Sequence, residues 1–461
     1  MKKHFGTMAI FGLYTFYYLV MELAVNDYAG SVIGCDKVTA LYGFCHLAVA
    51  AGFLLFPLAQ RYVKSAPAGP ALTIAAALLG GAAFLAVSFT VSPAWLVVCA
   101  LVTHLAAGYL GGAVYYYVAM KLRNWHRIGL TISIAYAGAF ALQALGLVLL
   151  SFLSVSAGRM IERIVLTLAL VIVAWFAATR IPAAAQPKAE AAKTPAGIRK
   201  YILGALAAMV LIAFLFGIND GIITSLHANS GGYFAGDFIA YGWPRLFAIP
   251  GLLVAGAVAD LKDRRFFPYA TLLSLIIVTV AILLFASPST YNIALCFVYF
   301  FCSFVSLFSL VPFFEWAPLT ANPPLVAAAG RSVRYACSGI TIMVSGALFA
   351  SASLLVILGL YVVLLALLFT AFYFMGQLRL PARGADETQS TLHAFVQKYG
   401  LTEREAEVLE LLCAGCSTAK MAEQLFISEK TVRAHIANMM KKTKTSSRGE
   451  LKMLAMQSRG E

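Results

Sequence analysis

The sequence predicts an all-α protein, in which a twelve-helix transmembrane bundle of two six-helix halves precedes a soluble four-helix domain. Of the 461 residues, 61% are hydrophobic and only 12% are charged, whereas an average soluble domain is about 25% charged. Long apolar runs recur through residues 1–375, and each can cross about 30 Å of hydrocarbon as a helix. The last 86 residues contain ten of the twenty acidic residues, which predicts a separate, water-soluble unit.

Twelve apolar runs define the predicted spans. They cover residues 5–25, 38–59, 71–91, 94–119, 128–154, 161–179, 201–223, 238–259, 267–286, 291–314, 333–350 and 353–375. The segment 181–200 is rich in Ala, Pro and Lys, which is typical of a flexible connector. It predicts a linker between two halves, residues 1–180 and 201–375.

The distribution of Lys and Arg predicts the orientation. With the N-terminus placed inside, inside segments hold 17 cations, Arg331 and Arg334 among them, and outside loops hold 3. Cytoplasmic loops carry the excess of Lys and Arg, so we predict a multi-pass protein of the cytoplasmic (inner) membrane with both termini in the cytoplasm. Most of the eight cysteines fall in apolar spans, which favours buried thiols over a disulfide framework.

The six-plus-six arrangement with a central linker resembles the major facilitator superfamily of transporters. The stretch Gly256-Ala-Val-Ala-Asp260-Leu-Lys-Asp263-Arg264-Arg265 resembles that family's Gly-x-x-x-Asp-Arg-x-Gly-Arg-Lys loop, a charge clamp between helices, with Asp263 in place of the second Gly. Span 4 has His104-Leu-Ala-Ala-Gly108 where the family often has Arg-x-x-x-Gly, and span 5 lacks the family's Gly-Pro-rich antiporter motif. The resemblance implies the architecture, and these departures argue against drug or proton antiport.

Polar side chains within the predicted spans are candidates for a small-molecule site, because charge at membrane depth is costly. Arg245 lies about seven residues into span 8 and needs an anion, which could be Glu22, Asp220 or a bound acid. For Asp220 the alternative is a solvated helix end. The candidate ligand-binding residues are Glu22, Asn26, His104, Asn219, Asp220 and Arg245.

Residues 395–461 are predicted to form the soluble domain, after a linker at 376–394 that contains Pro, Gly and mixed charge. Thr402 followed by Glu405 is a capping-box signal for a first helix. A second helix is expected at 417–425. Ser447 with Glu450 is a start signal for the fourth helix.

The third helix of this domain is expected to begin after Ser428, with Val432, Ile436 and Met439 as its apolar stripe. Two short helices joined by a tight turn form a helix-turn-helix, whose second helix enters the major groove of DNA. Seven basic residues stand against one acid between Lys430 and Lys452, so one face can neutralise phosphate.

The ordered residues of this tail closely resemble the DNA-binding domain of the LuxR/GerE family of bacterial transcription regulators. They include Leu401-Thr-Glu-Arg-Glu405, Gly415, Ile427-Ser428, Thr431-Val432, His435-Ile436 and Ser447-Arg448-x-Glu450-Leu451. The resemblance implies recognition-helix contacts to double-stranded DNA, with the two lysines on phosphate, and dimers through the last helix. The implied contact residues are Lys430, Thr431, Arg433, Ala434, Ala437, Asn438, Lys441 and Lys442.

Taken together, these patterns predict a membrane-embedded one-component regulator that senses a small molecule and binds promoter DNA, with RNA polymerase as a further partner. The alternative is a secondary transporter with a regulatory DNA-binding tail. No catalytic triad, Walker loop or metal-ligand cluster is evident in the sequence, so we expect no enzyme activity, cofactor or metal site. The pair Cys413-x-x-Cys416 has no accompanying second pair and is not expected to bind zinc.

The orientation can be tested with topology reporters. A reporter fused after Glu461 and a second one inserted in the segment 181–200 should both report the cytoplasm, because inside-loop cations outnumber outside ones 17 to 3. An external signal from the second reporter would contradict the predicted number of spans.

Overall fold

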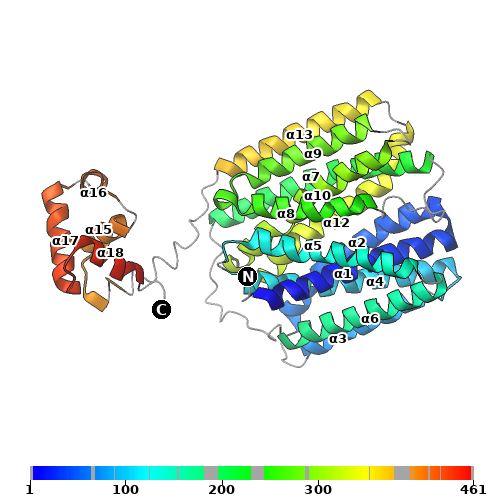
Figure 1. Cartoon of the computed structure of the whole chain (residues 1–461), viewed down its shortest axis with the longest axis horizontal. Helices are drawn as coiled ribbons and strands as arrows, with labels where there is room; N and C mark the ends of the chain where they lie inside the picture. The colour runs from blue at the N-terminus through cyan, green and yellow to red at the C-terminus, as the bar shows by residue number, and fades with distance from the viewer. Residues whose placement is uncertain are drawn as a thin grey trace. The chain divides into compact units, whose positions relative to one another are not determined.

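The computed structural model describes residues 4–63, 68–87, 89–123, 125–152, 155–180, 196–229, 243–285, 290–351, 354–377, 395–396, 398–413, 416–425 and 427–457. The chain divides into two compact units, Met1–Leu380 and Pro381–Glu461, and Figure 1 colours them from blue to yellow and from orange to red. Throughout the described residues, the regular elements are helices, as predicted. Most of the two predicted linkers, 181–195 and 378–394, lies outside the described residues.

The N-terminal unit is a multi-pass membrane domain. In its described part, eight helices are long and apolar enough to cross a membrane, and three more apolar helices are shorter. In Figure 1, α3, α4 and α6 lie on one side of this unit, and α9, α10 and α13 lie on the other. The main helices of this unit are α1 (Phe5–Ile33), α2 (Cys35–Tyr62), α3 (Ala68–Val87), α4 (Pro93–Lys121), α5 (Ile128–Ser151), α6 (Val155–Arg180), α7 (Ala196–Asn229), α8 (Ala248–Ala259), α9 (Phe267–Leu284), α10 (Tyr291–Phe308), α12 (Pro323–Ser351) and α13 (Leu354–Gln377).

Two helix boundaries differ from the prediction in ways that matter. Helix α7 begins at Ala196, inside the segment predicted as linker. Helix α12 begins at Pro323 rather than near residue 333, so Arg331 is a helical residue instead of a loop residue, and Arg334 lies well inside the helix instead of at its start. The prediction was wrong because it treated these two charges as an interfacial boundary. The small residues before them, Ala327 and Ala328, are fully buried and continue the packed helix.

Glycines allow the membrane helices to approach closely. A Cβ on Gly52 of α2 would lie 2.2 Å from the Leu105 carbonyl oxygen of α4, and a Cβ on Gly108 would lie 2.2 Å from that of Val49. Both distances are far below van der Waals contact, so only glycine fits at either position. Close approach through small residues is the usual basis of helix association in membranes. The Gly108 of the predicted span-4 motif therefore has a packing role here.

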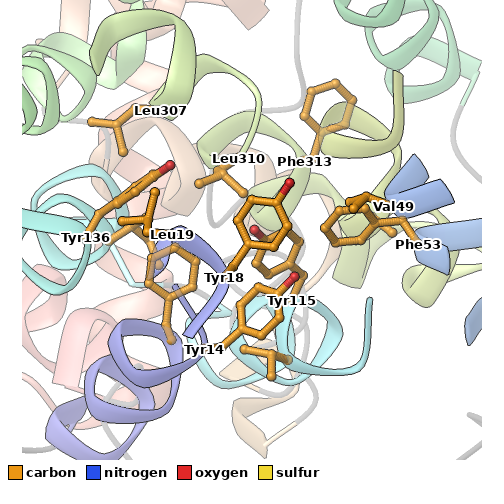
Figure 2. Close-up of a cluster of buried hydrophobic side chains, with 14 of the residues drawn as sticks. Tyr14, Tyr18, Leu19, Val49, Phe53, Tyr115, Tyr136, Leu307, Leu310 and Phe313 are labelled. Carbon is orange, nitrogen blue, oxygen red and sulfur yellow. The ribbon is translucent and has the colours of Figure 1, made fainter. Parts of the chain in front are cut away.

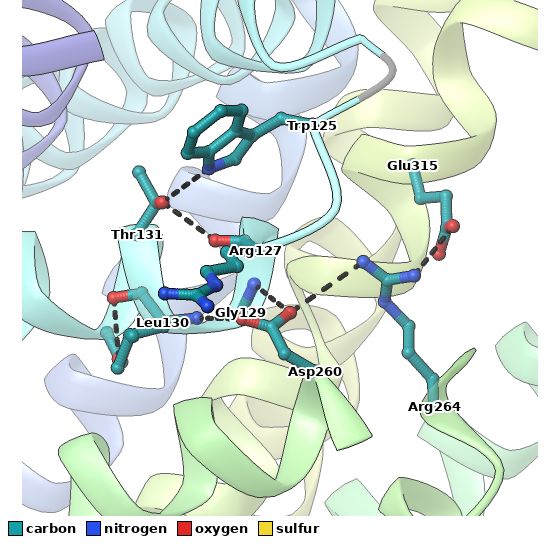
Figure 3. Close-up of polar contacts among 9 residues, drawn as sticks. Trp125, Arg127, Gly129, Leu130, Thr131, Asp260, Arg264 and Glu315 are labelled. Atoms are coloured by element: carbon teal, nitrogen blue, oxygen red, sulfur yellow. Dashed lines mark hydrogen bonds and ion pairs between the residues drawn. The ribbon is translucent and has the colours of Figure 1, made fainter. Parts of the chain in front are cut away.

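A charge cluster links the start of α5 to the end of α8 (Figure 3). The Asp260 carboxylate accepts hydrogen bonds from the backbone N–H groups of Gly129 (2.8 Å) and Leu130 (2.7 Å). Arg264 lies 3.9 Å from Asp260 and donates to Glu315 of α11 (Val311–Trp316) at 2.7 Å. Since the first N–H groups of a helix have no partner within it, Asp260 completes the N-terminus of α5. The stretch that resembles the transporter loop thus joins three segments.

Removal of the Asp260 charge should weaken this junction. In Asp260→Asn only one side-chain oxygen remains for two backbone N–H groups, and a charge-assisted bond is typically stronger than a neutral one by a factor of about two. We expect a loss of about 2 kcal/mol in stability, seen as a lower melting temperature of the purified protein in detergent. Asp27→Asn, at an exposed position of α1, is the matched control and should melt like the wild type. Equal melting of both variants would show that the junction contributes little.

Candidate functional site

The C-terminal unit packs short helices around a small apolar core. In its described residues the helices are α15 (Glu403–Cys413), α16 (Thr418–Leu425), α17 (Glu429–Thr443) and α18 (Arg448–Gln457). The predicted stripe of α17 is confirmed, since Val432, Ile436 and Met439 are all buried. They pack with other core residues, including Phe395, Leu401, Val408, Leu409, Leu412, Met421, Leu451 and Ala455.

The predicted cap signals operate with one addition. The Thr402 and Glu405 capping box is formed, because the Thr402 N–H donates to the Glu405 carboxylate (2.7 Å) and the Glu405 N–H donates to the Thr402 hydroxyl (3.3 Å). Ser428 caps α17 by accepting from the Thr431 N–H at 3.1 Å. At α18 the Glu450 N–H donates to the Ser447 hydroxyl (3.1 Å), as predicted, while the Glu450 carboxylate accepts from the N–H and hydroxyl of Ser446. These hydrogen bonds lower the pKa of Glu450 below its ordinary value.

Helix α17 presents a continuous exposed face beside its buried stripe. The residues predicted to contact DNA are all exposed: Lys430, Thr431, Arg433, Ala434, Ala437, Asn438, Lys441 and Lys442. Arg433 forms an ion pair with Glu429 one turn earlier (3.0 Å), in which both side chains are largely exposed. Such a pair is weak, so it does not hold the guanidinium away from a ligand. The face therefore combines basic groups with small side chains, as base and phosphate contact requires.

One predicted phosphate contact has a second partner. The Lys442 ammonium lies 2.7 Å from the Glu405 carboxylate and also donates to the Gly400 carbonyl oxygen at 3.0 Å. The Glu405 side chain is only 4% exposed. Burial alone would raise the pKa of Glu405, but the hydrogen bonds from Lys442 and Thr402 outweigh it and hold that pKa below the ordinary value. Lys442 therefore links α17 to the start of α15.

Arg448 fixes α18 to the segment before α16. Its guanidinium donates to the Thr418 hydroxyl (3.0 Å) and to the Cys416 carbonyl oxygen (2.9 Å). Cys413 and Cys416 are both free thiols. Among the described residues no group of His, Cys, Asp or Glu could hold a metal ion.

In the membrane unit, the predicted ligand-site residues bond mainly to partners outside the predicted set. The Glu22 carboxylate accepts from His46 (2.9 Å) and from the Tyr18 hydroxyl (3.2 Å). Arg245 is half-buried and lies over the Phe140 ring, 5.2 Å from its centroid.

The remaining members of the predicted set are mostly buried amides and an imidazole. His104 is fully buried, and its Nδ1 bonds to the Ala100 carbonyl oxygen at 2.8 Å. Asn219 of α7 accepts from the Tyr361 hydroxyl of α13. Asn26 is 5% exposed. The Asp220 side chain lies outside the described residues.

A cluster of aromatic rings fills the centre of the membrane unit (Figure 2). Tyr115 of α4 packs against Tyr14 of α1 and Phe53 of α2, with ring centroids 5.7 and 5.2 Å apart. Arg331 is part of this interior: it is 3% exposed, and its Nη2 donates to the Tyr136 hydroxyl at 3.0 Å. The sequence analysis did not identify Arg331 as an interior residue. The available signal was the run of small apolar residues directly before it.

Comparison with known proteins identifies the C-terminal unit. The sequence pattern of the GerE type, described as bacterial regulatory proteins of the luxR family, matches residues 400–455. Over 56 residues the chain is 50% identical to the spore germination protein GerE of Bacillus subtilis (strain 168), a match that covers 12% of this chain and 76% of GerE. The chain belongs to the luxR family.

A second relative in the luxR family is much longer than the matching segment. The nitrate/nitrite response regulator protein NarP of Escherichia coli (strain K12) is 45% identical over 60 residues, which are 13% of this chain and 28% of NarP. The chain therefore spans about a quarter of the length of this relative. The sequence similarity between this chain and NarP is confined to these 60 residues.

The membrane unit is similar in structure to a transporter of known structure. The crystal structure of a variant of the Escherichia coli fucose:proton symporter FucP superimposes with a TM-score of 0.52 at 13% sequence identity, covering 82% of this chain and 98% of that one. At this identity the similarity shows the fold alone. The luxR-family domain is thus fused to a membrane domain whose fold is similar to that of FucP.

Alanine variants of Lys441 and Lys442 should differ in their effect on the stability of the C-terminal unit. Lys442→Ala leaves the buried Glu405 carboxylate without its ammonium partner, so the fragment 381–461 should lose about 1–3 kcal/mol of unfolding free energy. Lys441 is exposed, so the unfolding free energy of Lys441→Ala should stay within about 0.5 kcal/mol of the wild-type value. Urea unfolding at pH 7 measures both. Equal stability of the two variants would contradict the role given to Lys442.

The contact between Lys442 and Glu405 also predicts how the stability of the C-terminal unit depends on pH. Because the pKa of Glu405 is lowered on folding, its stabilisation is present above the unfolded pKa of about 4.3. It is lost as the pH falls through the lower folded pKa. Glu405→Gln should remove this part of the pH dependence.

Proposed function

We propose that this chain is a membrane-embedded one-component transcriptional regulator, in which a transporter-like unit binds a small molecule and the luxR-family unit binds promoter DNA. The observation that carries the proposal is the exposed face of α17, where all eight expected contact residues are exposed while the stripe between them is buried. The description of the family as bacterial regulatory proteins, and the relative named as a response regulator, support DNA as the partner.

The remaining parts of the proposal follow from the family and the charge distribution. We place the protein in the inner membrane with both termini in the cytoplasm, which gives the luxR-family unit access to the chromosome. The unit acts as a homodimer through α18, and RNA polymerase is its partner at the promoter. The predicted polar residues Glu22, Asn26, His104, Asn219, Asp220 and Arg245 are proposed to contribute to the small-molecule site.

A secondary transporter with a regulatory tail is the alternative. The fold shared with a proton symporter supports it. Against it stands His104, which replaces the arginine of the motif associated with proton coupling and whose Nδ1 is occupied by a backbone carbonyl. Uptake or efflux by the protein reconstituted in vesicles would favour the transporter.

The regulator proposal is tested first on DNA. The fragment 381–461 should bind duplex promoter DNA in a strongly salt-dependent way, because phosphate contacts dominate affinity. Arg433→Ala should relax sequence preference by about 1–3 kcal/mol, whereas Lys441→Ala should weaken all sequences alike and make binding less salt-dependent.

Binding measurements on matched and mismatched duplexes over a salt series distinguish the two variants. Transcript profiles of cells with the wild-type chain and with full-length Arg433→Ala then show whether DNA contact has a regulatory consequence. If both variants lose the same amount of specificity, the division between base and phosphate contacts is wrong. If neither changes transcription, the regulator proposal fails.

A further inference from the structure

Arg331 of α12 is a buried guanidinium with an incomplete set of partners. It is 3% exposed, and its Nη2 donates to the Tyr136 hydroxyl at 3.0 Å. Its Nε is buried and has no hydrogen-bond partner in the part of the chain that the structure describes. Within that same part, no carboxylate forms an ion pair with it. A buried charge without a counter-charge is costly, and within a membrane domain such a residue is a functional-site candidate.

Three carboxylates among the described residues of the membrane unit contact other basic groups. Glu22 pairs with His46 at 2.9 Å. Asp260 and Glu315 both face Arg264. Arg331 is therefore a buried cation to which the described residues give hydroxyl and ring contacts and no anion.

The surroundings of Arg331 are aromatic. Its guanidinium carbon lies 5.4 Å from the Tyr136 ring centroid and 6.0 Å from that of Tyr335. The Tyr335 ring is nearly parallel to Phe53, with centroids 6.1 Å apart and planes inclined by 15°. These rings come from α5, α12 and α2, so helices from both predicted halves meet at this arginine. Ring faces attract a cation, but they do not neutralise its charge.

We propose that Arg331 anchors a binding site for an aromatic carboxylate between α2, α5 and α12. The planar guanidinium presents donors in a fork that matches a carboxylate, and its buried Nε has no hydrogen-bond partner among the described residues. The ligand ring lies against Tyr335 and Phe53. This inference deepens the proposed function by naming the ligand class of the membrane unit, and it moves the anchoring cation from Arg245 to Arg331.

Binding by the full-length protein in lipid nanodiscs tests the site without any DNA readout. The probes are benzoate, the neutral benzamide and the non-aromatic cyclohexanecarboxylate, measured by equilibrium dialysis and by the shift in melting temperature. Benzoate should bind saturably, benzamide should not, and cyclohexanecarboxylate should bind more weakly. Arg331→Gln should weaken benzoate binding by about tenfold or more, because the charge partner is lost.

Arg334→Gln is the matched control. Arg334 lies on the same helix, is half-buried, and donates to the Ser306 hydroxyl at 3.0 Å, so its loss should leave benzoate binding intact. Phenylglyoxal labelling of the wild type avoids the risk that Arg331→Gln does not fold. Benzoate should protect Arg331 from the reagent and leave the labelling of Arg334 unchanged.

Several results would overturn the proposal. These are no saturable benzoate binding by the folded wild type, unchanged binding in Arg331→Gln, loss of binding in Arg245→Gln instead, or absence of benzoate-protected labelling at Arg331. None of them depends on transcription. A failure here would thus leave the DNA-binding proposal standing, while a failure of the DNA experiments would leave the ligand site to be judged by its own measurements.

Discussion

A charged or polar group inside a lipid-embedded bundle must find its partner within the protein, because hydrocarbon supplies none. This constraint explains most of the polar contacts of the membrane unit. The Asp260 carboxylate completes the first turn of α5, and Arg264 is held between Asp260 and Glu315. Glu22 and the Nε2 atom of His46 are hydrogen-bonded at the α1–α2 interface. Arg331 differs from these groups, because its buried Nε has no hydrogen-bond partner among the described residues.

Close helix packing is what lets such short-range contacts form. Helices α2 and α4 approach closely at Gly52 and Gly108. Helices α5 and α8 do the same at Gly129 and Gly256. At each of these positions a Cβ atom would obstruct the contact between the backbones. The second of these contacts lies beside Asp260, so close packing and charge satisfaction act at the same junction. Since many different apolar side chains can fill the rest of the interface, a transporter-like fold can persist at 13% identity.

Local signals in the sequence are sufficient to predict the caps and the exposed face of α17. The caps at Thr402 and Ser428 involve residues three positions apart, and the exposed face of α17 follows from helical periodicity alone. Contacts between distant segments are beyond such reasoning. Lys442 meets Glu405 across 37 positions, and Arg331 meets Tyr136 across 195. A single sequence contains the residue types for these contacts but not their pairing, and for that reason the sequence alone predicts a loop at Arg331.

Communication between the two units need not involve direct contact. A ligand shifts an equilibrium only by its difference in affinity for two arrangements of the membrane helices, and a difference of about 1–3 kcal/mol changes the ratio by about 5–150-fold. If one arrangement favours association of two membrane units, two luxR-family units become tethered near each other at high effective concentration. Such tethering can raise the avidity for a paired DNA site by about 10²–10⁴-fold without any new protein–DNA contact. A site at Arg331 is suited to this, because α12 contacts both α2 and α7. An anion there would favour the arrangement in which α2, α5 and α12 close on it.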